Sequence, residues 1–368
     1  MITGFALLYS LLLLTLTHSF VVDRPTIRSK TTAQFASVLS DASLQSDYFL
    51  DGSAISTSGK AAIHSGFRKC PVTGERCGLP LVIKSSTNIQ AILRELENYR
   101  KVANNEVFAQ IWDSLIPKDS QVYFATTAAI IMEKGDCDLL DFLRDNGPME
   151  GQTLREAATQ VANCVKAVHD SQMVWTEVKS ENFVLCNGVI KGIDLESAVP
   201  LGSCVIDFTP KTSPPEFALG FLKGRPKENE MAFDFDVWSL GTVYYEMATG
   251  ELFHDKKHIL EVAEIIMHLT QSDLDAFLLH KVADPVFRDL IGSCLSLDRA
   301  RRPTVHEVLQ HPFIDASFSH SSTTIQSGSH LDVLTTQYMD DLKGATSDPF
   351  HSPSKQSRRS YSPSFCSP

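Results

Sequence analysis

Two short segments, VWTEVKSENFVL and GIDLES, carry most of the chemically useful side chains of this chain. They supply the carboxylates Glu177 and Asp194, the carboxamide Asn182 and the ammonium group of Lys179. Carboxylate and carboxamide oxygens are ligands that Mg²⁺ accepts, and an ammonium group can contact phosphate. Asn and Asp also cap turns, so a purely structural role for Asn182 and Asp194 stays open. The residue types therefore indicate metal and phosphate chemistry.

The elements that must position these residues change character along the chain. Strand-like stretches come first, at 54–58, 61–67 and 79–84 and again at 121–127 and 128–134. Between these two groups, a helix is predicted over 89–102, with Ile89, Ile92, Leu93, Leu96 and Tyr99 on one face. After Gly135 further helices are predicted at 139–146, 153–170, 234–250 and 258–270. Strands followed by helices predict an α+β fold of two lobes.

The order and spacing of the motifs resemble a eukaryotic protein kinase of the Ser/Thr type over about residues 48–314. Glu177 and Asn182 have the spacing of the HRDxxxxN catalytic loop, and Asp194 lies where the DFG aspartate is expected. PPE at 214–216, DVWSLG at 236–241 and RARRPT at 299–304 resemble later kinase motifs. The resemblance implies a small β-rich N-lobe at 46–135 and a larger helical C-lobe at 136–314. It also implies a Glu216–Arg302 ion pair and a supporting role for Asp236.

By the same resemblance, the expected cofactors are ATP and Mg²⁺. Lys84 in LPLVIK would contact the α- and β-phosphates and be held by Glu95, although their short spacing leaves Glu97 as an alternative. Asn182 and Asp194 would bind Mg²⁺, while Glu177, Lys179 and Thr209 would act on the acceptor hydroxyl and the γ-phosphate. The remaining expected nucleotide contacts are Met132 as gatekeeper, Glu133 and Gly135 on the hinge, and Ser56, Ser58 and Gly59 in the loop over the phosphates.

Several positions depart from the family pattern. The loop at 56–61 reads STSGKA, so the three expected glycines carry side chains, which predicts weaker nucleotide binding. Glu177 is one methylene longer than the expected aspartate, and a shift of about 1 Å at the reacting centre can cost about 10²-fold in rate. Trp175 and Thr176 replace His and Arg, and Thr176 cannot pair with a phosphate in residues 197–213. Glu196 replaces the DFG glycine and would bind a second cation or repel nucleotide phosphates.

Three functions are compatible with this pattern. The first is an ATP- and Mg²⁺-dependent Ser/Thr protein kinase of low or atypical activity, acting on a protein substrate. The second is a pseudokinase, which would bind nucleotide or a scaffold partner without phosphotransfer. The third is a small-molecule kinase, against which PPE, DVWSLG and RRPT count. The sequence favours an enzyme, and exchanging Glu177 for Asp would separate the first two possibilities.

The composition limits the partners and the redox chemistry. The formal net charge of −11 argues against nucleic-acid binding. Eight cysteines are scattered without a CxxC pair, and only Cys70 and Cys77 lie close together. These two could form a disulfide or a redox switch, or remain free thiols beside a turn; two ligands are too few for a closed zinc site.

The two ends of the chain read as non-globular. Residues 1–45 resemble a targeting segment, because the uncharged FALLYSLLLLTLT has the length of a signal-peptide core rather than of a membrane span. The Ser- and Thr-rich stretch after it resembles a transit peptide. Entry into the secretory pathway is expected, with a secondary-plastid destination or a single N-terminal anchor as alternatives and no extended membrane domain. The Ser-rich tail at 315–368 is predicted to be disordered.

Overall fold

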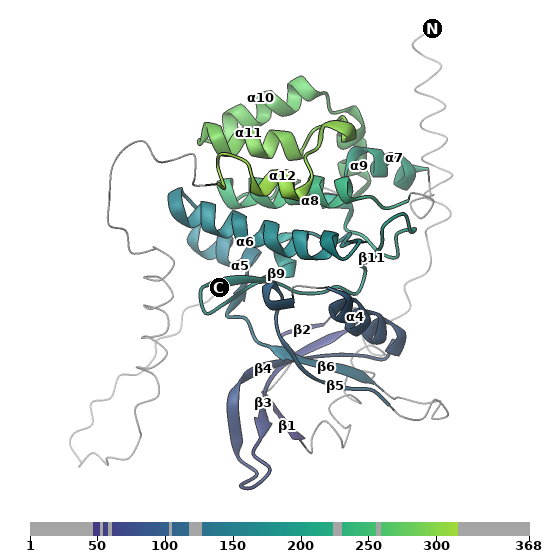
Figure 1. The fold of residues 1–368 in the computed structure, drawn as a ribbon, viewed down its shortest axis with the longest axis vertical. Helices are drawn as coiled ribbons and strands as arrows, with labels where there is room; N and C mark the ends of the chain where they lie inside the picture. Colours follow the sequence, from purple (N-terminus) through teal and green to yellow (C-terminus); the bar gives the residue numbers. More distant parts are fainter. Residues whose placement is uncertain are drawn as a thin grey trace, which may run out of the picture. The chain divides into compact units, whose positions relative to one another are not determined.

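The structure is a computed structural model of the chain, and it describes residues 47–51, 54–57, 61–102, 105–117, 127–223, 230–254 and 259–315. These residues belong to one compact unit. A β-rich first lobe is followed along the chain by a helical second lobe, as the change from purple to green in Figure 1 shows. The predicted two-lobed α+β fold is therefore confirmed.

The first lobe contains an antiparallel sheet with the strand order β1-β3-β4-β6-β5, and β2 pairs with β3. Its strands are β1 Tyr48–Leu50, β2 Ser56–Thr57, β3 Ala62–Lys69, β4 Arg76–Ser86, β5 Ile111–Leu115 and β6 Ala128–Glu133. Lys84 in β4 lies opposite Ile63 of β3 and Ile130 of β6. Hydrogen-bonded strands on both sides of β4 therefore fix the backbone of Lys84.

Two strands of this sheet, β1 and β5, were missed by the sequence analysis. β5 pairs with β6, but its sequence IWDSL lacks a regular apolar alternation because Asp113 and Ser114 interrupt it. The predicted strand at 121–127 lies outside the described residues, except for Thr127, which precedes β6. The predicted strands at 54–58, 61–67, 79–84 and 128–134 correspond to β2, β3, the end of β4 and β6.

Among the described residues of the first lobe, the α-helix is α4, Ile89–Lys101. It begins at Asn88, whose side chain accepts a hydrogen bond from the N–H of Ala91. Ile92 and Leu96 pack against β6, but the prediction for Leu93 was wrong, because this side chain is 38% exposed. The buried face instead extends to polar residues that contact the second lobe.

The second lobe is built around helix α8, Phe233–Thr249, which is buried along most of its length. The other helices are α5 Leu139–Asn146, α6 Gly151–Asp170, α7 Pro215–Leu222, α9 Ile259–His268, α10 Gln271–Lys281, α11 Pro285–Cys294 and α12 Val305–Leu309. The four predicted helices of this region correspond to α5, α6, α8 and α9. Trp238, Tyr244 and Tyr245 of α8 belong to the main apolar core. Because this core is closely packed, α8 is a rigid support for the loops that contact it.

The loops of the second lobe are organised by short strands. β9 Phe183–Cys186 and β10 Val189–Gly192 form a hairpin, β7 Cys137–Asp138 pairs with β9, and β8 Met173–Val174 pairs with β11 Val199–Pro200. The turn of the hairpin is Asn187-Gly188, with φ values of 51° and 79°. Asn-Gly is the strongest short-range signal for such a turn, although the sequence analysis did not use it. The hairpin connects the end of VWTEVKSENFVL, whose last three residues lie in β9, to GIDLES, whose first residue ends β10.

Some predictions fall on residues that the structure does not describe. These are the targeting segment, the Ser-rich tail, Ser58 and Gly59. Cys70, which follows β3, and Cys77, the second residue of β4, are free thiols. Among the described helices, none combines the length and the apolar character that a membrane span requires.

Candidate active site

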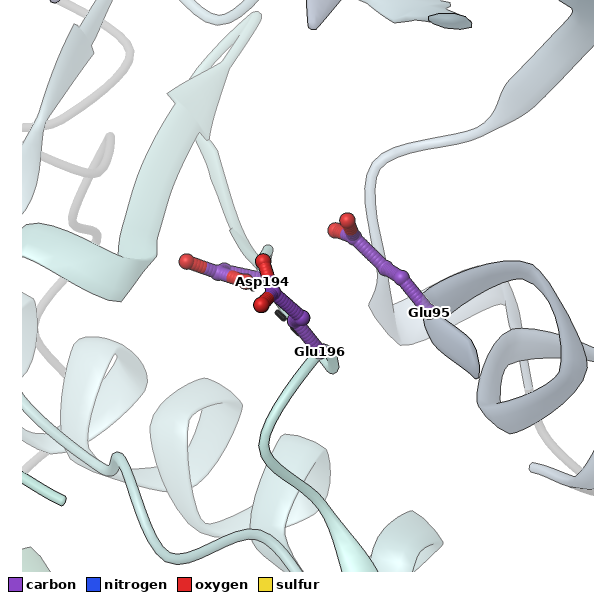
Figure 2. A group of neighbouring side chains, drawn as sticks. All are labelled: Glu95, Asp194 and Glu196. Carbon is purple, nitrogen blue, oxygen red and sulfur yellow. Dashed lines mark hydrogen bonds between the residues drawn. The ribbon is translucent and has the colours of Figure 1, made fainter. Parts of the chain in front are cut away.

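Lys84 is the centre of an ion-pair cluster between the two lobes. Its Nζ lies 2.9 Å from Oε2 of Glu95 on α4 and 3.0 Å from Oδ1 of Asp194 in the loop after β10. Of the two predicted partners of Lys84, the structure therefore pairs Glu95, whereas the exposed Glu97 pairs with Lys101 at 3.6 Å. Figure 2 shows the carboxylate of Glu95 directed from its helix toward those of Asp194 and Glu196.

Burial and neighbouring charges shift the pKa values of Lys84 and Asp194 in opposite directions. Burial alone would lower the pKa of Lys84, but the carboxylates of Glu95 and Asp194 outweigh it, so the pKa is raised and the ammonium stays charged. Burial would raise the pKa of Asp194, but Lys84 holds it below its usual value. The cluster therefore keeps a cation and a carboxylate charged beside each other at neutral pH.

Asp236 of α8 holds the loop that carries Glu177. Its carboxylate accepts hydrogen bonds from the N–H groups of Trp175 at 2.6 Å and Thr176 at 2.8 Å, and it lies 3.0 Å from Nε2 of His169. Thr176 has a φ of 67°, which is rare for a β-branched residue. A strained backbone persists only where its surroundings hold it, and Asp236 provides that support.

The side chains of Glu177, Lys179 and Thr209 come together at this loop. Nζ of Lys179 lies 3.4 Å from Oε1 of Glu177 and donates to Oγ1 of Thr209 at 3.0 Å. The Thr209 hydroxyl donates in turn to the same Oε1 at 3.4 Å. Thr209 comes from a segment 32 residues later in the chain, so the fold assembles the three residues that the sequence analysis had grouped.

Asn182 and Asp194 retain oxygens that could bind a metal. Nδ2 of Asn182 donates to the main-chain carbonyl of Glu177 at 2.8 Å, which leaves the amide oxygen for another ligand. Lys84 and the N–H of Glu196 both bond to Oδ1 of Asp194, so neither bond uses Oδ2. A carboxamide oxygen and a carboxylate oxygen suit Mg²⁺. The donor set therefore fits the expected cation.

Three aromatic rings form a packed column beside Asp194. The Tyr99 ring of α4 contacts Phe108 with centroids 5.8 Å apart, and Phe108 contacts Trp175 at 5.4 Å. Asp194 itself has a φ of 65°. The column therefore joins the helix that carries Glu95 to the loop that carries Glu177.

The predicted adenine and loop residues lie on the first lobe and on the connection between the lobes. Met132 is buried near the end of β6, Glu133 ends that strand, and Gly135 follows in the connection. A Cβ on Gly135 would lie 2.7 Å from Cβ of Val184, so glycine is required for the close approach of this connection to β9. Ser56 lies in β2, in the hairpin with β3 where the phosphate-covering loop was expected.

Four residues were not predicted to belong to this site: Arg94, Asn98, Ser197 and Tyr99, the last of which was expected only on the apolar face of its helix. Arg94 donates from Nε to the main-chain carbonyl of Glu196 at 2.8 Å, and its Nη2 lies 3.5 Å from Oε1 of the same residue. Asn98 is a polar residue, although it is buried on the inner face of α4. A polar side chain on such a face was the signal that could have identified it.

The ion pair of Glu216 and Arg302 has the geometry that the resemblance implied. Nη1 and Nη2 of Arg302 bind the two carboxylate oxygens of Glu216 at 2.7 and 2.8 Å. The Arg302 side chain is fully buried and also donates from Nε to the carbonyl of Ser296. This pair ties the end of the segment that contains Thr209 to the second lobe.

Comparison with known proteins gives the family. The protein kinase domain matches residues 81–314, which are more than half of the chain. The chain therefore belongs to the protein kinase family, as its two lobes and its site indicate.

Several similar curated proteins are named as serine/threonine-protein kinases. Serine/threonine-protein kinase pim-2 of Danio rerio is 30% identical over 183 residues, covering 48% of this chain and 53% of that protein. Serine/threonine-protein kinase mph1 of Schizosaccharomyces pombe is 26% identical over 256 residues, covering 62% and 37%. Testis-specific serine/threonine-protein kinase 1 of Mus musculus is 26% identical over 235 residues, covering 60% and 59%. The chain thus spans less than two thirds of the length of each of these relatives.

Proposed function

We propose that this chain is an ATP- and Mg²⁺-dependent Ser/Thr protein kinase of low or atypical activity. The observation that carries the proposal is the contact of both Lys179 and Thr209 with Oε1 of Glu177. A carboxylate held in this way can orient an acceptor hydroxyl and accept its proton. The neighbouring ammonium offers positive charge to the transferred phosphoryl group.

The other residues of the site bind and orient the nucleotide in this proposal. Lys84, held by Glu95, binds the α- and β-phosphates, and the main chain of Glu133 and Gly135 binds adenine. Asn182 and Asp194 hold Mg²⁺, which when bound supplies charge neutralisation at the phosphates of ATP. Positioning and electrostatics supply most of the catalysis in phosphoryl transfer, so an impaired phosphate-covering loop lowers the activity without removing the chemistry.

The second candidate is a nucleotide-binding pseudokinase. It is favoured by the side chains at 56–61, where the family has glycines, and by the extra methylene of Glu177. Both features weaken the positioning on which phosphoryl transfer depends. A pseudokinase would keep Lys84, Asn182 and Asp194 for nucleotide binding and would act as a scaffold or regulatory module.

A comparison of four forms of the full chain tests the proposal: wild type, Glu177→Asp, Glu177→Gln and Asp194→Ala. Mg²⁺-dependent ATP binding is measured by titration, and transfer is measured with radiolabelled ATP on generic basic and acidic protein substrates and on the chain itself. We expect wild-type transfer to fall at least about 10²-fold in Glu177→Gln with little loss of ATP binding. We expect Asp194→Ala to lose Mg²⁺-dependent binding.

Each alternative gives a different result. Wild type that binds ATP and transfers nothing, while Glu177→Asp transfers phosphate, supports the pseudokinase. Wild-type transfer that Glu177→Gln leaves intact shows that Glu177 has no part in the reaction. Thr270→Ala serves as a control, because Thr270 caps the distant helix α10.

A further inference from the structure

Glu196 takes part in an ion pair between helix α4 and the loop that begins at Asp194. Arg94 binds it twice, with Nε on the main-chain carbonyl and Nη2 on the carboxylate. The other carboxylate oxygen of Glu196 lies 3.9 Å from Nζ of Lys84. The side chains of Arg94 and Glu196 are 32% and 19% exposed, so solvent screens this pair only in part.

Two cationic side chains lie among the three carboxylates around Glu196. Glu95, Asp194 and Glu196 bring carboxylate oxygens within 4.8 Å of one another. Lys84 contacts all three carboxylates, and Arg94 contacts the third. The two cations therefore neutralise most of the negative charge, and the contacts favour an ion-pair network over a second metal site.

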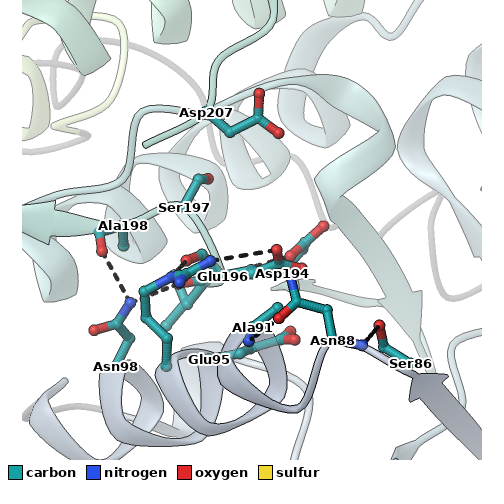
Figure 3. Close-up of polar contacts among 12 residues, drawn as sticks. Ser86, Asn88, Ala91, Glu95, Asn98, Asp194, Glu196, Ser197, Ala198 and Asp207 are labelled. Carbon is teal, nitrogen blue, oxygen red and sulfur yellow. Dashed lines mark hydrogen bonds and ion pairs between the residues drawn. The ribbon is translucent and has the colours of Figure 1, made fainter. Parts of the chain in front are cut away.

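A second side chain of α4 reinforces the same contact. Nδ2 of Asn98 donates to the main-chain carbonyls of Leu195 at 2.8 Å and Ala198 at 2.9 Å. Arg94 and Asn98 are four residues apart, so they lie one above the other on the helix. Figure 3 shows the Asn98 side chain directed from α4 toward the loop that carries Asp194, Glu196 and Ala198. The helix that carries Glu95 is thus fixed to this loop by two neighbouring side chains.

Thr176 fixes the same segment from the second lobe without any charge. Its buried hydroxyl donates to the carbonyl of Ser197 at 3.1 Å and lies 3.3 Å from the carbonyl of Asp207. A phosphate orders such a segment by pairing with an arginine, and Thr176 offers no cation for that purpose. Arg94, the nearby cation on α4, is already paired with the carboxylate of Glu196, which carries its charge without any phosphorylation.

We propose that Glu196 is a positioning residue. Its ion pair with Arg94 holds α4 against the Asp194 loop, so that the Lys84–Glu95 pair forms without a phosphorylated side chain. The inference rests on the proposed function in one respect, because the pair that it maintains is the one proposed to bind ATP. The position of α4 is nevertheless measurable without phosphotransfer.

The test uses the full chain after phosphatase treatment, with the absence of phosphate verified by mass spectrometry. Hydrogen exchange of the amides in 89–101 and the Kd for Mg²⁺-ATP are measured in wild type, Glu196→Gln, Arg94→Met and the double variant. We expect each single change to accelerate exchange in α4 about 3- to 10-fold and to weaken ATP binding by a similar factor. The double variant should show no loss beyond that of Arg94→Met, because Arg94→Met already removes both the pair with the Glu196 carboxylate and the Nε bond to its main-chain carbonyl.

Two further variants sharpen the result. Arg94→Lys keeps the charge but loses the Nε bond, so its exchange rate should lie between those of wild type and Arg94→Met. Glu97→Gln removes the exposed pair with Lys101 on the same helix and should leave both readouts unchanged.

Specific outcomes overturn the proposal. Phosphatase treatment that itself loosens α4, single variants that leave exchange unchanged, or losses that add up in the double variant each exclude it. If wild type transfers no phosphate but α4 responds as expected, the kinase activity fails and the positioning role stands. If wild type transfers phosphate and α4 does not respond, only the positioning role fails.

Discussion

Trp175 donates its indole N–H to the main-chain carbonyl of Asp194 at 2.9 Å and so connects the loop that carries Glu177 to the loop that carries Asp194. On the other side of the same residue, the hydroxyl of Tyr99 accepts the N–H of Asp194 at 3.1 Å. Two aromatic side chains therefore satisfy both main-chain groups of a residue with a strained positive φ. The tryptophan that replaces the expected histidine retains a polar function.

Trp175→Phe should weaken both stability and nucleotide binding. The variant leaves the Asp194 carbonyl without its donor, at a cost of about 1–3 kcal/mol, and it also creates a small cavity in a fully buried position. Denaturant unfolding and a Mg²⁺-ATP titration measure the two effects. Trp112→Phe is the control, because Trp112 is 40% exposed and its replacement should cost less than about 0.5 kcal/mol. Equal losses in the two variants would contradict the role assigned to the indole N–H.

Arg302→Met should destabilise the chain far more than Arg301→Met does. The first change removes the fully buried Arg302 side chain, which binds both carboxylate oxygens of Glu216. Breaking a buried ion pair costs about 3–5 kcal/mol. The lower end of this range is expected, because the Glu216 side chain is 31% exposed. Arg301 is 79% exposed and pairs with Asp298, which is itself 59% exposed, so its loss should cost less than about 1 kcal/mol. Urea unfolding of both variants gives the comparison, and similar midpoints would refute the ranking.

The periodicity of the sequence was sufficient for most of the fold, whereas the residues of the site were predicted from the order and spacing of motifs that resemble those of protein kinases. Helices α4, α5, α6, α8 and α9 have apolar patterns long enough to be recognised. Glu177, Asn182 and Asp194 are separated by fixed spacings along loops that the fold holds close together. Their placement could therefore be inferred from a single chain.

The contacts that decide positioning could not be inferred in this way. Arg94 and Glu196 lie 102 residues apart, and nothing local in either segment specifies their pairing. The choice of Glu95 over Glu97 depends on the rotation of α4, which the packing of Ile92 and Leu96 on β6 sets. Strand β5 escaped prediction because strand propensity depends on its neighbours in the sheet.

Glu246→Gln should change how stability depends on pH. Burial raises the pKa of this carboxyl to about 7, although the Ser180 hydroxyl, which donates to it, acts in the opposite direction. Between its ordinary pKa of 4.5 and about 7, the unfolded chain ionises while the folded chain does not, so stability falls as pH rises and levels off above about 7.

Because the glutamine variant lacks this titration, the free energy of unfolding of wild type minus that of Glu246→Gln should decrease between pH 4.5 and 7. The expected decrease is on the order of 1–3 kcal/mol, at about 1.4 kcal/mol per pKa unit. Urea unfolding at several pH values measures it, with the exposed Glu264→Gln as the control. A difference that stays constant or grows with pH would show that Glu246 is ionised in the folded chain.

Thr209→Val should lower phosphotransfer without weakening nucleotide binding. The Thr209 hydroxyl accepts from Lys179 and donates to Glu177, so its loss frees both side chains from a defined geometry, and a misplacement of this kind costs about 10- to 100-fold in rate. Thr209→Ser keeps the hydroxyl and should retain most of the activity. The kcat and the Kd for Mg²⁺-ATP of the three forms are the measurements. A serine variant as impaired as the valine variant would show that the methyl group of Thr209, and not its hydroxyl, maintains the site.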